Sequence, residues 1–258
     1  MSELSGVQAI WLREFKVFLR EKSRVVASIA QPIVWLVLMG AGLGGRVQVD
    51  LPAGENYTAF IFPGLLFMSV LFTSMFYGMY IVWDRKLDFL KEVLAAPVRR
   101  SSIFLGKVLG GTTDSIVQTA ILLLLGAVLL PVLSPGFPGL DPARAVAVLP
   151  VAFLLSAGVS SLGLAIGSRF ESFEGFQLVS TFVMFPLFFL SGALYPTTGL
   201  PAYLGWVVRA NPLTYAVDLL RWLLLGTTGA HPALDVAVLV GFTLAMFGFG
   251  AFMFQRMK

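Results

Sequence analysis

Residues 58–83 read TAFIFPGLLFMSVLFTSMFYGMYIVW, an apolar run without a single charged residue. A helix rises about 1.5 Å per residue, so this run is long enough to cross the roughly 30 Å hydrocarbon core of a membrane. It ends abruptly at residues 84–100, the densely charged stretch DRKLDFLKEVLAAPVRR. Together the two stretches predict a membrane-spanning helix followed by a loop outside the bilayer.

The composition of the whole chain agrees with this interpretation. Of its 258 residues, 57% are hydrophobic and 12% are charged, whereas about a quarter are charged in an ordinary soluble domain. The predicted fold class is all-α, a polytopic membrane protein that forms a single transmembrane domain over residues 1–258. The six predicted transmembrane helices lie at about 25–45, 58–83, 108–133, 143–168, 175–194 and 233–254.

Another apolar stretch, residues 195–230, is predicted to enter the outer leaflet without crossing it. Three charged residues interrupt it, and a charge at the bilayer centre costs about 2.5–3.5 kcal/mol. We expect two short helices, broken at Asn211-Pro212, with protein covering the irregular backbone. The residues assigned to this re-entrant outer element are Pro196, Pro201, Arg209, Asn211, Pro212, Tyr215, Asp218 and Arg221.

The placement of basic residues predicts the orientation of the spans. With six spans and both termini in the cytoplasm, 14 of the 18 Lys and Arg residues lie inside. A seventh span would move Arg256 and Lys258 outside, against the positive-inside rule. The net charge of +4 is therefore explained by membrane topology, and no nucleic-acid partner is expected. The expected location is the cell membrane, and a prokaryotic source is expected.

Residues 7–24 are predicted to form an interfacial helix, which lies in the membrane surface. At 100° per residue the basic residues occupy one arc, facing anionic lipid, and the apolar residues another. Since a span follows at once, anchoring alone does not require this helix, and we expect it to transmit motion along the membrane plane. The apolar arc holds Val7, Trp11, Leu12, Phe15, Phe18 and Leu19; the basic arc holds Arg13, Lys16, Arg20 and Arg24.

The charged loop itself has the pattern of an amphipathic helix. The apolar residues Leu87, Phe89, Leu90, Val93 and Leu94 cover an arc of about 160°, and charged residues fill most of the opposite side. Two interpretations follow from the pattern alone. The helix packs on its own bundle or on lipid, or it docks into a groove of a soluble partner.

Enzyme chemistry is not expected. The chain has no cysteine and one histidine, which excludes thiolate metal sites and histidine-based triads. The string SSIFLGKV lacks the first glycine and the final Ser or Thr of a P-loop, so no ATP or other cofactor is expected in this chain. Glu171 and Glu174 are expected to be solvated or to cap a helix instead of forming a catalytic pair.

Asp114 and Gln118, at the start of the third span, are candidates for lining a transport pathway. An acid inside a span is by default a functional hypothesis. The competing interpretation is that Asp114 lies near the cytoplasmic end, where water or a basic group satisfies it. Both interpretations remain open from the sequence.

Two separated motifs resemble one family. WDRKLDFLKEVLAAPVRRSSIFLGKVLGG (83–111) is similar to the charged loop of type-2 ATP-binding-cassette exporter permeases, in the branch of the nodulation-factor and daunorubicin export permeases. FPLFFLSGALYPTTGLPAYLGWVVRANPLTYAVDLLR (185–221) resembles the Asn-Pro-Leu-Thr-Tyr region of the same family. AQPIVWLVLMGAGLGG (30–45) fits as well, so the resemblance covers essentially the whole chain. One departure is Lys86-Leu87-Asp88, where many members carry a glycine.

The resemblance implies an exporter permease for an amphipathic substrate such as a drug, a lipid or a lipid-linked saccharide. It implies pairing with a second copy or a homologous permease, and with a separate P-loop ATPase subunit that binds ATP and Mg. It also implies that residues 84–97 form the coupling helix for that ATPase, and that residues 195–230 close the outer exit. The coupling residues are Asp84, Arg85, Leu87, Phe89, Leu90, Glu92, Val93, Leu94 and Pro97.

Three other classes of protein compete with this interpretation. An ion-coupled secondary transporter with Asp114 as relay would need a second intramembrane acid or broken spans in matching halves. An importer permease would dock through a longer loop with different glycine spacing. A non-transporting membrane assembly factor would tolerate the scarcity of polar residues in the spans.

Overall fold

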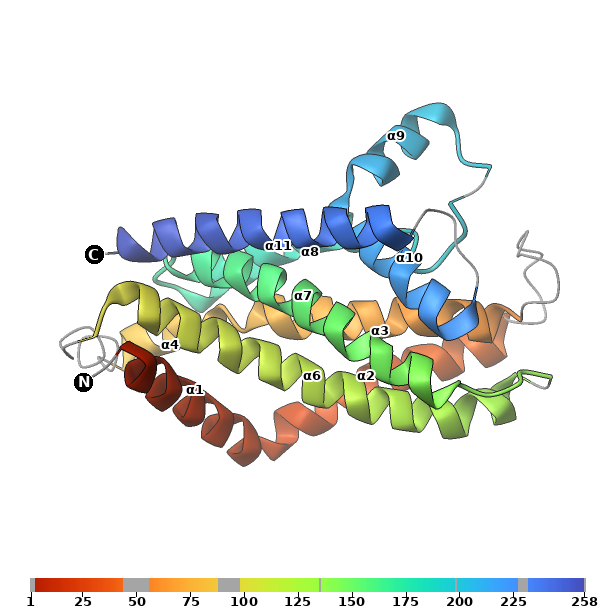
Figure 1. Cartoon of the computed structure of the whole chain (residues 1–258), viewed down its shortest axis with the longest axis horizontal. Helices are drawn as coiled ribbons and strands as arrows, with labels where there is room; N and C mark the ends of the chain where they lie inside the picture. Colours follow the sequence, from red (N-terminus) through yellow and green to blue (C-terminus); the bar gives the residue numbers. More distant parts are fainter. Residues whose placement is uncertain are drawn as a thin grey trace.

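The protein is a bundle of helices that run side by side along its longest axis, here described from a computed structural model (Figure 1). The structure describes residues 3–43, 56–87, 98–134, 136–197, 199–226 and 232–257. Over those ranges the regular elements are helices and no strand occurs, which confirms the all-α prediction. The elements are α1 (Glu3–Arg20), α2 (Lys22–Leu43), α3 (Tyr57–Phe76), α4 (Met79–Lys86), α6 (Arg100–Leu133), α7 (Pro142–Gly167), α8 (Phe173–Phe189), α9 (Ala202–Ala210), α10 (Pro212–Leu225) and α11 (Pro232–Gln255).

Four helical segments are long and apolar enough to cross a membrane. They are Tyr57–Lys86, which combines α3 and α4, and the helices α6, α7 and α11. The segments Val26–Gly40 in α2 and Phe173–Phe189 are apolar but shorter. The chain is therefore a multi-pass membrane protein.

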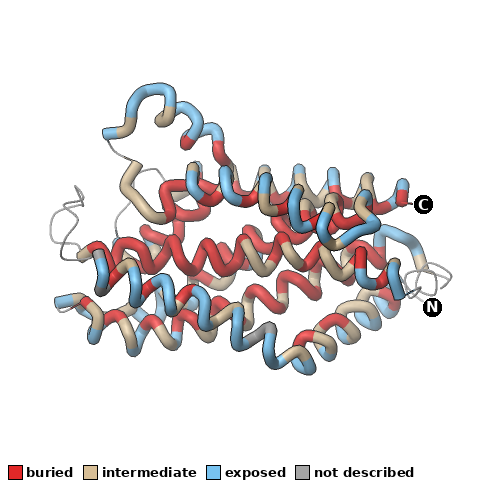
Figure 2. Tube along the Cα trace, turned by 180° about the vertical axis from the view of Figure 1, so that it is seen from behind, coloured by how far each residue is buried: buried red, intermediate tan, exposed pale blue. Residues whose placement is uncertain are grey.

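Helix α3 forms the centre of the bundle. It packs against α2, α6, α7 and α10, and its tube is buried along most of its length (Figure 2). A helix that is apolar all round has no face suited to water, so it is buried on all sides. Close packing at its C-terminal end depends on glycine: a Cβ at Gly78 would lie 2.0 Å from the carbonyl oxygen of Gly163 in α7. Small residues of this kind let helix backbones approach within a membrane.

Three predicted boundaries require correction. The span predicted to start at 108 is part of a longer helix that begins at Arg100, because the short helix expected before it, IFLGKVLG, continues into the span without a break. The interfacial helix predicted at 7–24 ends at Arg20, and α2 begins at Lys22. The span predicted at 175–194 ends at Phe189, since the backbone turns at Gly192, whose φ of 74° suits glycine.

Two helices occupy the segment 195–230, and the chain breaks between them at Asn211. The Asn211 side chain accepts a hydrogen bond from the Leu213 amide and so caps α10, while Pro212 takes the first helical position. Helix α10 packs on α3, α7 and α11. In contrast, α9 projects away from the bundle (Figure 1).

Candidate functional site

The charged loop leaves the bundle at the end of α4 and returns at the start of α6, at the same end of the molecule (Figure 1). Of the predicted coupling residues, Asp84, Arg85 and Leu87 are described. The remaining ones lie outside the described residues, so their prediction stays untested: Phe89, Leu90, Glu92, Val93, Leu94 and Pro97. What the structure does show is how both ends of this loop are fixed.

Close to the described ends of the loop lies a group of four charged residues, Arg13, Glu14, Asp84 and Lys107, here called the ionic cluster; all but Arg13 are buried. The Lys107 Nζ lies 3.0 Å from Glu14 Oε1 and 2.6 Å from Asp84 Oδ2. Arg13 donates to both carboxylates, at 2.8 Å to Glu14 and 3.1 Å to Asp84. The cluster therefore joins α1, α4 and α6 through two cations and two anions.

Because most of the ionic cluster is buried, loss of one member destabilises the others. The Lys107 side chain is only 1% exposed, and those of Glu14 and Asp84 are nearly as buried. Burying a charge is costly, and removal of one partner leaves an uncompensated charge worth about 3–5 kcal/mol. The buried pairs of Lys107 with Glu14 and with Asp84 therefore hold α1, α4 and α6 in their mutual position.

The entering end of the loop is also fixed to the turn between α7 and α8. Arg85 donates hydrogen bonds to the carbonyl oxygens of Ser168, at 2.9 Å, and Phe170, at 3.0 Å. A cation at the C-terminus of α7 is favoured by the helix dipole as well. Trp83 packs against Phe173, at 4.9 Å between ring centroids, and Lys86 lies over the same ring. These contacts connect α4 to the α7–α8 turn and to the first turn of α8.

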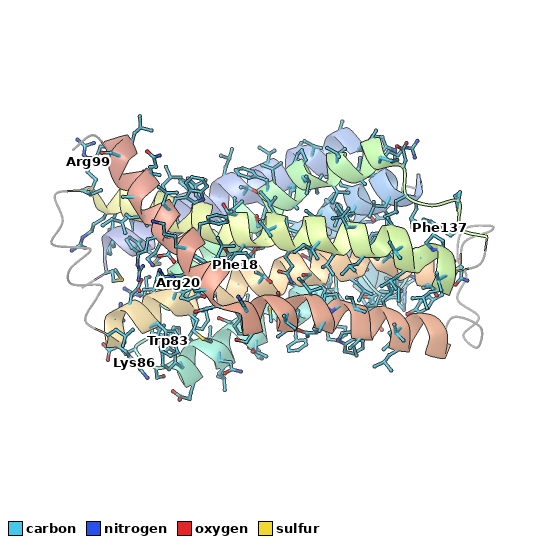
Figure 3. The ribbon with its side chains drawn as sticks, turned by 90° about the horizontal axis from the view of Figure 1, so that it is seen from below. Phe18, Arg20, Trp83, Lys86, Arg99 and Phe137 are labelled. Carbon is cyan, nitrogen blue, oxygen red and sulfur yellow. The ribbon has the colours of Figure 1, made fainter. Side chains whose placement is uncertain are left out.

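The returning end of the loop is fixed to the two terminal helices. Arg99 pairs with Glu3 at 3.4 Å, and Figure 3 shows Arg99 beside the start of α1. Arg100 donates to the carbonyl oxygens of Gln255 and Met257, at 2.8 and 2.7 Å, at the end of α11. The base of the loop, meaning the ionic cluster and these arginine contacts, thus contacts α1, α6, the α7–α8 turn and α11.

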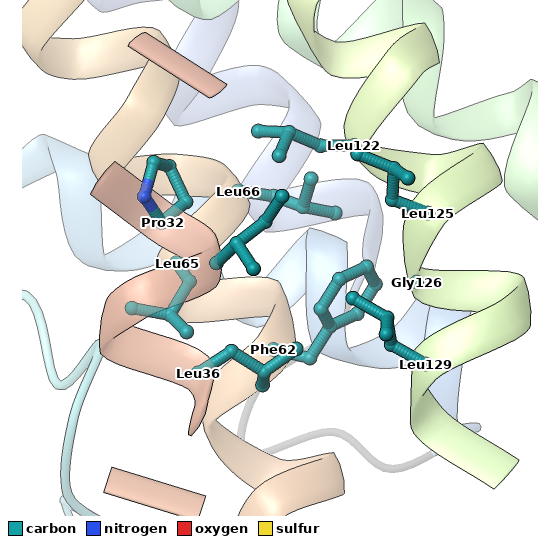
Figure 4. A pocket seen from close by; sticks show the side chains of 10 residues that line it. Pro32, Leu36, Phe62, Leu65, Leu66, Leu122, Leu125, Gly126 and Leu129 are labelled. Carbon is teal, nitrogen blue, oxygen red and sulfur yellow. The ribbon is translucent and has the colours of Figure 1, made fainter. Parts of the chain in front are cut away.

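Both predicted pathway residues, Asp114 and Gln118, are buried on α6. The Gln118 amide donates to the carbonyl oxygen of Ser28 in α2, at 2.7 Å, and accepts from the Thr73 hydroxyl, at 2.6 Å. Its side chain therefore holds α2, α3 and α6 together. Between the same three helices, on the side away from the charged loop, lies a cavity of only about 10 Å³ with apolar walls, between Pro32, Phe62 and Leu129 (Figure 4).

In the predicted outer element, α10 is fixed to the end of α8 through Arg221 and Asn211. The buried Arg221 donates to the carbonyl oxygens of Gly192 and Ala193, at 2.6 and 3.2 Å, and its guanidinium lies 4.0 Å above the Phe60 ring. Asn211 donates to the Leu187 carbonyl at 2.8 Å. These contacts satisfy backbone groups that the end of α8 leaves open.

The other predicted outer residues lie around α9. Tyr215 donates to the Arg209 carbonyl at 3.0 Å, across the break. Burial raises the pKa of Asp218, while the nearby Arg221 opposes that rise. A cavity of about 640 Å³ lies between α9, α10 and the start of α11, and Arg209, Tyr215 and Asp218 are in its lining. Pro196 lies in the segment after α8, Pro201 precedes α9 and Pro212 opens α10.

Two members of the ionic cluster, Glu14 and Lys107, were missed by the sequence analysis. A signal existed for Glu14, because at 100° per residue it falls on the apolar arc of α1, between Val7 and Ile10. An acid on an apolar face needs a buried partner. Lys107 offered the complementary signal, as a lone base between apolar residues in IFLGKVLG.

Known proteins resemble this chain over most of its length. The family model for the ABC-2 type transporter matches residues 5–225. Nodulation protein J of Rhizobium leguminosarum bv. trifolii is 28% identical over 236 residues, 90% of this chain and 85% of the relative. The inner membrane transport permease YadH of Escherichia coli K12 is 28% identical over 249 residues, covering 94% and 91%. A putative transport permease, ycf38 of Porphyra purpurea, is 28% identical over 225 residues, covering 85% and 74%.

Proposed function

The chain belongs to the ABC-2 type transporter family, and from that premise we propose that it is the permease subunit of an ATP-driven exporter. The family match over residues 5–225 carries this proposal, together with relatives whose names describe transport permeases. The cargo is an amphipathic molecule, such as a drug, a lipid or a lipid-linked saccharide, that leaves the cytoplasm or the inner leaflet. The chain itself performs no catalysis.

In this proposal the bundle has six membrane spans. Four of the spans are the long apolar segments, and the other two are α2 and α8, whose apolar segments are shorter. Both termini lie in the cytoplasm of a prokaryotic cell, so that the basic residues near the charged loop face inward. Helix α1 lies in the inner interface, and α9 and α10 form the re-entrant element of the outer leaflet.

Energy comes from a separate P-loop ATPase subunit that binds ATP and Mg. Residues 84–97 dock into it as the coupling helix, with the apolar side chains from Leu87 to Leu94 in a groove of the partner. The anchoring of both loop ends supports this assignment. A helix that delivers motion needs stiff connections to the bundle, and the base of the loop provides them to α1, α6, α8 and α11.

The transport cycle follows from those connections. Closure of the ATPase dimer on ATP displaces the coupling helices of two permeases, either two copies of this chain or this chain and a homologue. Arg85 and Trp83 pass the displacement to the start of α8, and α3 and α8 shift at the seam between the subunits. Helices α9 and α10 then open the exit that they close at rest.

Replacing Leu90 and Leu94 with aspartate tests the docking step. We expect the permease to reach the membrane but to lose its ATPase, as measured by co-purification and by substrate-stimulated ATP hydrolysis. The matched control is Leu234→Asp, since Leu234 is an exposed leucine at the start of α11, at the opposite end of the molecule from the loop. A Leu90→Asp, Leu94→Asp variant that retains the ATPase and its substrate response contradicts the proposal.

A further inference from the structure

A cavity of about 390 Å³ lies between the second half of α1 and the end of α4, next to the ionic cluster. This volume falls within the range of about 300–1,000 Å³ that is usual for ligand sites. Its walls are mainly apolar and aromatic, and they include Val17, Phe76, Met79, Tyr80 and Trp83. Trp83 and Leu87 are exposed at its edge, so the apolar wall continues to the surface of the protein.

Arg13 is the basic residue of the lining, and further basic side chains lie on the segments that form the rim of this cavity. At 100° per residue Arg20 projects within about 60° of Val17, which lines the cavity, and Arg13 lines it directly. Lys16, Arg20 and Lys22 are exposed on the same segment, and Lys86 is exposed on α4. Figure 3 shows Arg20, Trp83 and Lys86 on the same side of the molecule. The lining contains two acids, but Asp84 is bound to Lys107 and Arg13, and Glu21 accepts the Tyr80 hydroxyl at 2.6 Å.

We propose that this cavity is a binding site for one anionic phospholipid of the cytoplasmic leaflet. Its acyl chain lies against the aromatic wall, and its phosphodiester lies at the basic rim near Arg20. An apolar groove with a cationic edge at the level of an interfacial helix matches both ends of such a lipid. The exposed side chains at the edge are apolar, Trp83 and Leu87, and the exposed charged side chains on α1 and α4 named here are basic, which matches the two parts of an anionic lipid.

The lipid would also touch the machinery that carries motion. Arg13 lines the cavity and belongs to the ionic cluster, and Trp83 lines it and packs on Phe173 ahead of α8. A bound lipid therefore fills the space between α1 and α4 and keeps the two helices in register. An unfilled cavity would leave the second half of α1 with less apolar contact to the end of α4, although the ionic cluster still joins the two helices. Anionic lipid content then regulates how well the loop is coupled to the bundle.

Tryptophan quenching tests the site directly. The full-length chain is reconstituted in phosphatidylcholine vesicles as a variant that keeps only Trp83, the other four tryptophans being replaced by phenylalanine. Brominated phosphatidylglycerol or brominated phosphatidylcholine is then added at equal mole fractions. One Lys or Arg near the headgroup is worth about a factor of five in affinity. We expect brominated phosphatidylglycerol to bind beside Trp83 at least about fivefold more tightly.

Two further substitutions locate the site. Arg20→Gln should reduce the preference for phosphatidylglycerol by about fivefold, whereas Arg144→Gln, the same change at an exposed arginine of α7, should not alter it. Val17→Phe fills the cavity and should weaken quenching by both lipids. The single-tryptophan variant must also remain helical, as checked by far-ultraviolet circular dichroism, and monodisperse, as checked by gel filtration.

Several results would overturn the proposal. Equal quenching by the two lipids would show that the site has no preference for anionic lipid. A preference that survives Arg20→Gln would show that the phosphodiester does not bind near Arg20. Absence of quenching by either lipid means that protein, such as a second copy, covers the cavity. Relief of quenching by inorganic phosphate would show that the cavity binds a free anion instead of a phospholipid. The choice of leaflet rests on the proposed exporter topology, but the quenching does not depend on transport, so failure of the lipid site and failure of the exporter assignment are distinguishable.

Discussion

The two ends of the bundle are held together by different chemistry. At the base of the charged loop, three buried charges and the partly exposed Arg13 join three helices, and arginines reach from the loop ends to α7 and α11. At the opposite end, α10 is attached through hydrogen bonds to backbone carbonyls, and α9 has its main contacts with α10. We infer that one end is built to transmit force and the other to open.

The largest effect is expected from removal of the Lys107 charge. Lys107→Met leaves Glu14 and Asp84 sharing a buried site with Arg13 alone, which should lower the free energy of unfolding by about 3–5 kcal/mol. Thermal unfolding of the purified chain measures this loss. Lys16→Met is the matched control, because Lys16 is exposed on α1. Equal stability of the Lys107→Met protein would show that the cluster holds nothing together.

A smaller loss is expected at the opposite end from Arg221→Met. The substitution leaves the buried carbonyls of Gly192 and Ala193 without their donor and removes the contact with Phe60, at a cost of about 3 kcal/mol. The matched control is Arg209→Met, since Arg209 is exposed on the neighbouring helix α9. If Arg221→Met cost more than Lys107→Met, the outer end would be the more rigid one, and the comparison would be reversed.

A moderate loss is expected from Arg85→Ala. The carbonyl oxygens of Ser168 and Phe170 lose a charged donor that is partly exposed. We therefore expect the free energy of unfolding to fall by about 2 kcal/mol. The more informative change is in function: the complex should assemble and hydrolyse ATP, while substrate no longer stimulates hydrolysis. Lys86→Ala serves as control, because it removes a neighbouring exposed charge that, among the residues the structure describes, contacts the Phe173 ring. Retained stimulation in Arg85→Ala would exclude this contact from the coupling route.

The smallest effect on stability is expected from Trp206→Ala on α9. The side chain is 72% exposed, and substitutions at such positions usually change stability by no more than about 0.5 kcal/mol. Trp and Tyr favour the level of the lipid headgroups, so shallower immersion of α9 should appear as faster quenching of a probe at Tyr203→Cys by a water-soluble reagent. An unfolding free energy lowered by more than 1.5 kcal/mol would show that α9 packs on protein instead.

Much of the helical architecture could be predicted from the sequence because each span is a long apolar run. The break at Asn211-Pro212 was also legible, since an Asn cap followed by proline at the first helical position is a local signal. Local sequence signals did not predict contacts between residues that are far apart in the sequence. Glu14 and Lys107 are separated by 93 positions, and no periodicity links an acid on one helix with a base on another.

Two predicted helix boundaries were wrong for a related reason. The short helix expected before the third span proved continuous with it, because Arg100 and Lys107, which suggested a boundary, are satisfied by α11 and by the ionic cluster. The end of α8 was predicted too late because residues up to Leu194 are apolar. Their backbone carbonyls are instead used by Arg221, a residue far along the chain. Tertiary partners decided both boundaries.

The central claim is that motion of the charged loop reaches the outer end through the base of the loop. The chain has no native cysteine, so spin labels at Tyr203→Cys in the two permeases of the complex report the distance between their α9 helices. We predict that ATP changes this distance in the otherwise unaltered complex and that Arg85→Ala abolishes most of the change while ATP hydrolysis continues. An undiminished change of distance in the Arg85→Ala complex would contradict the account.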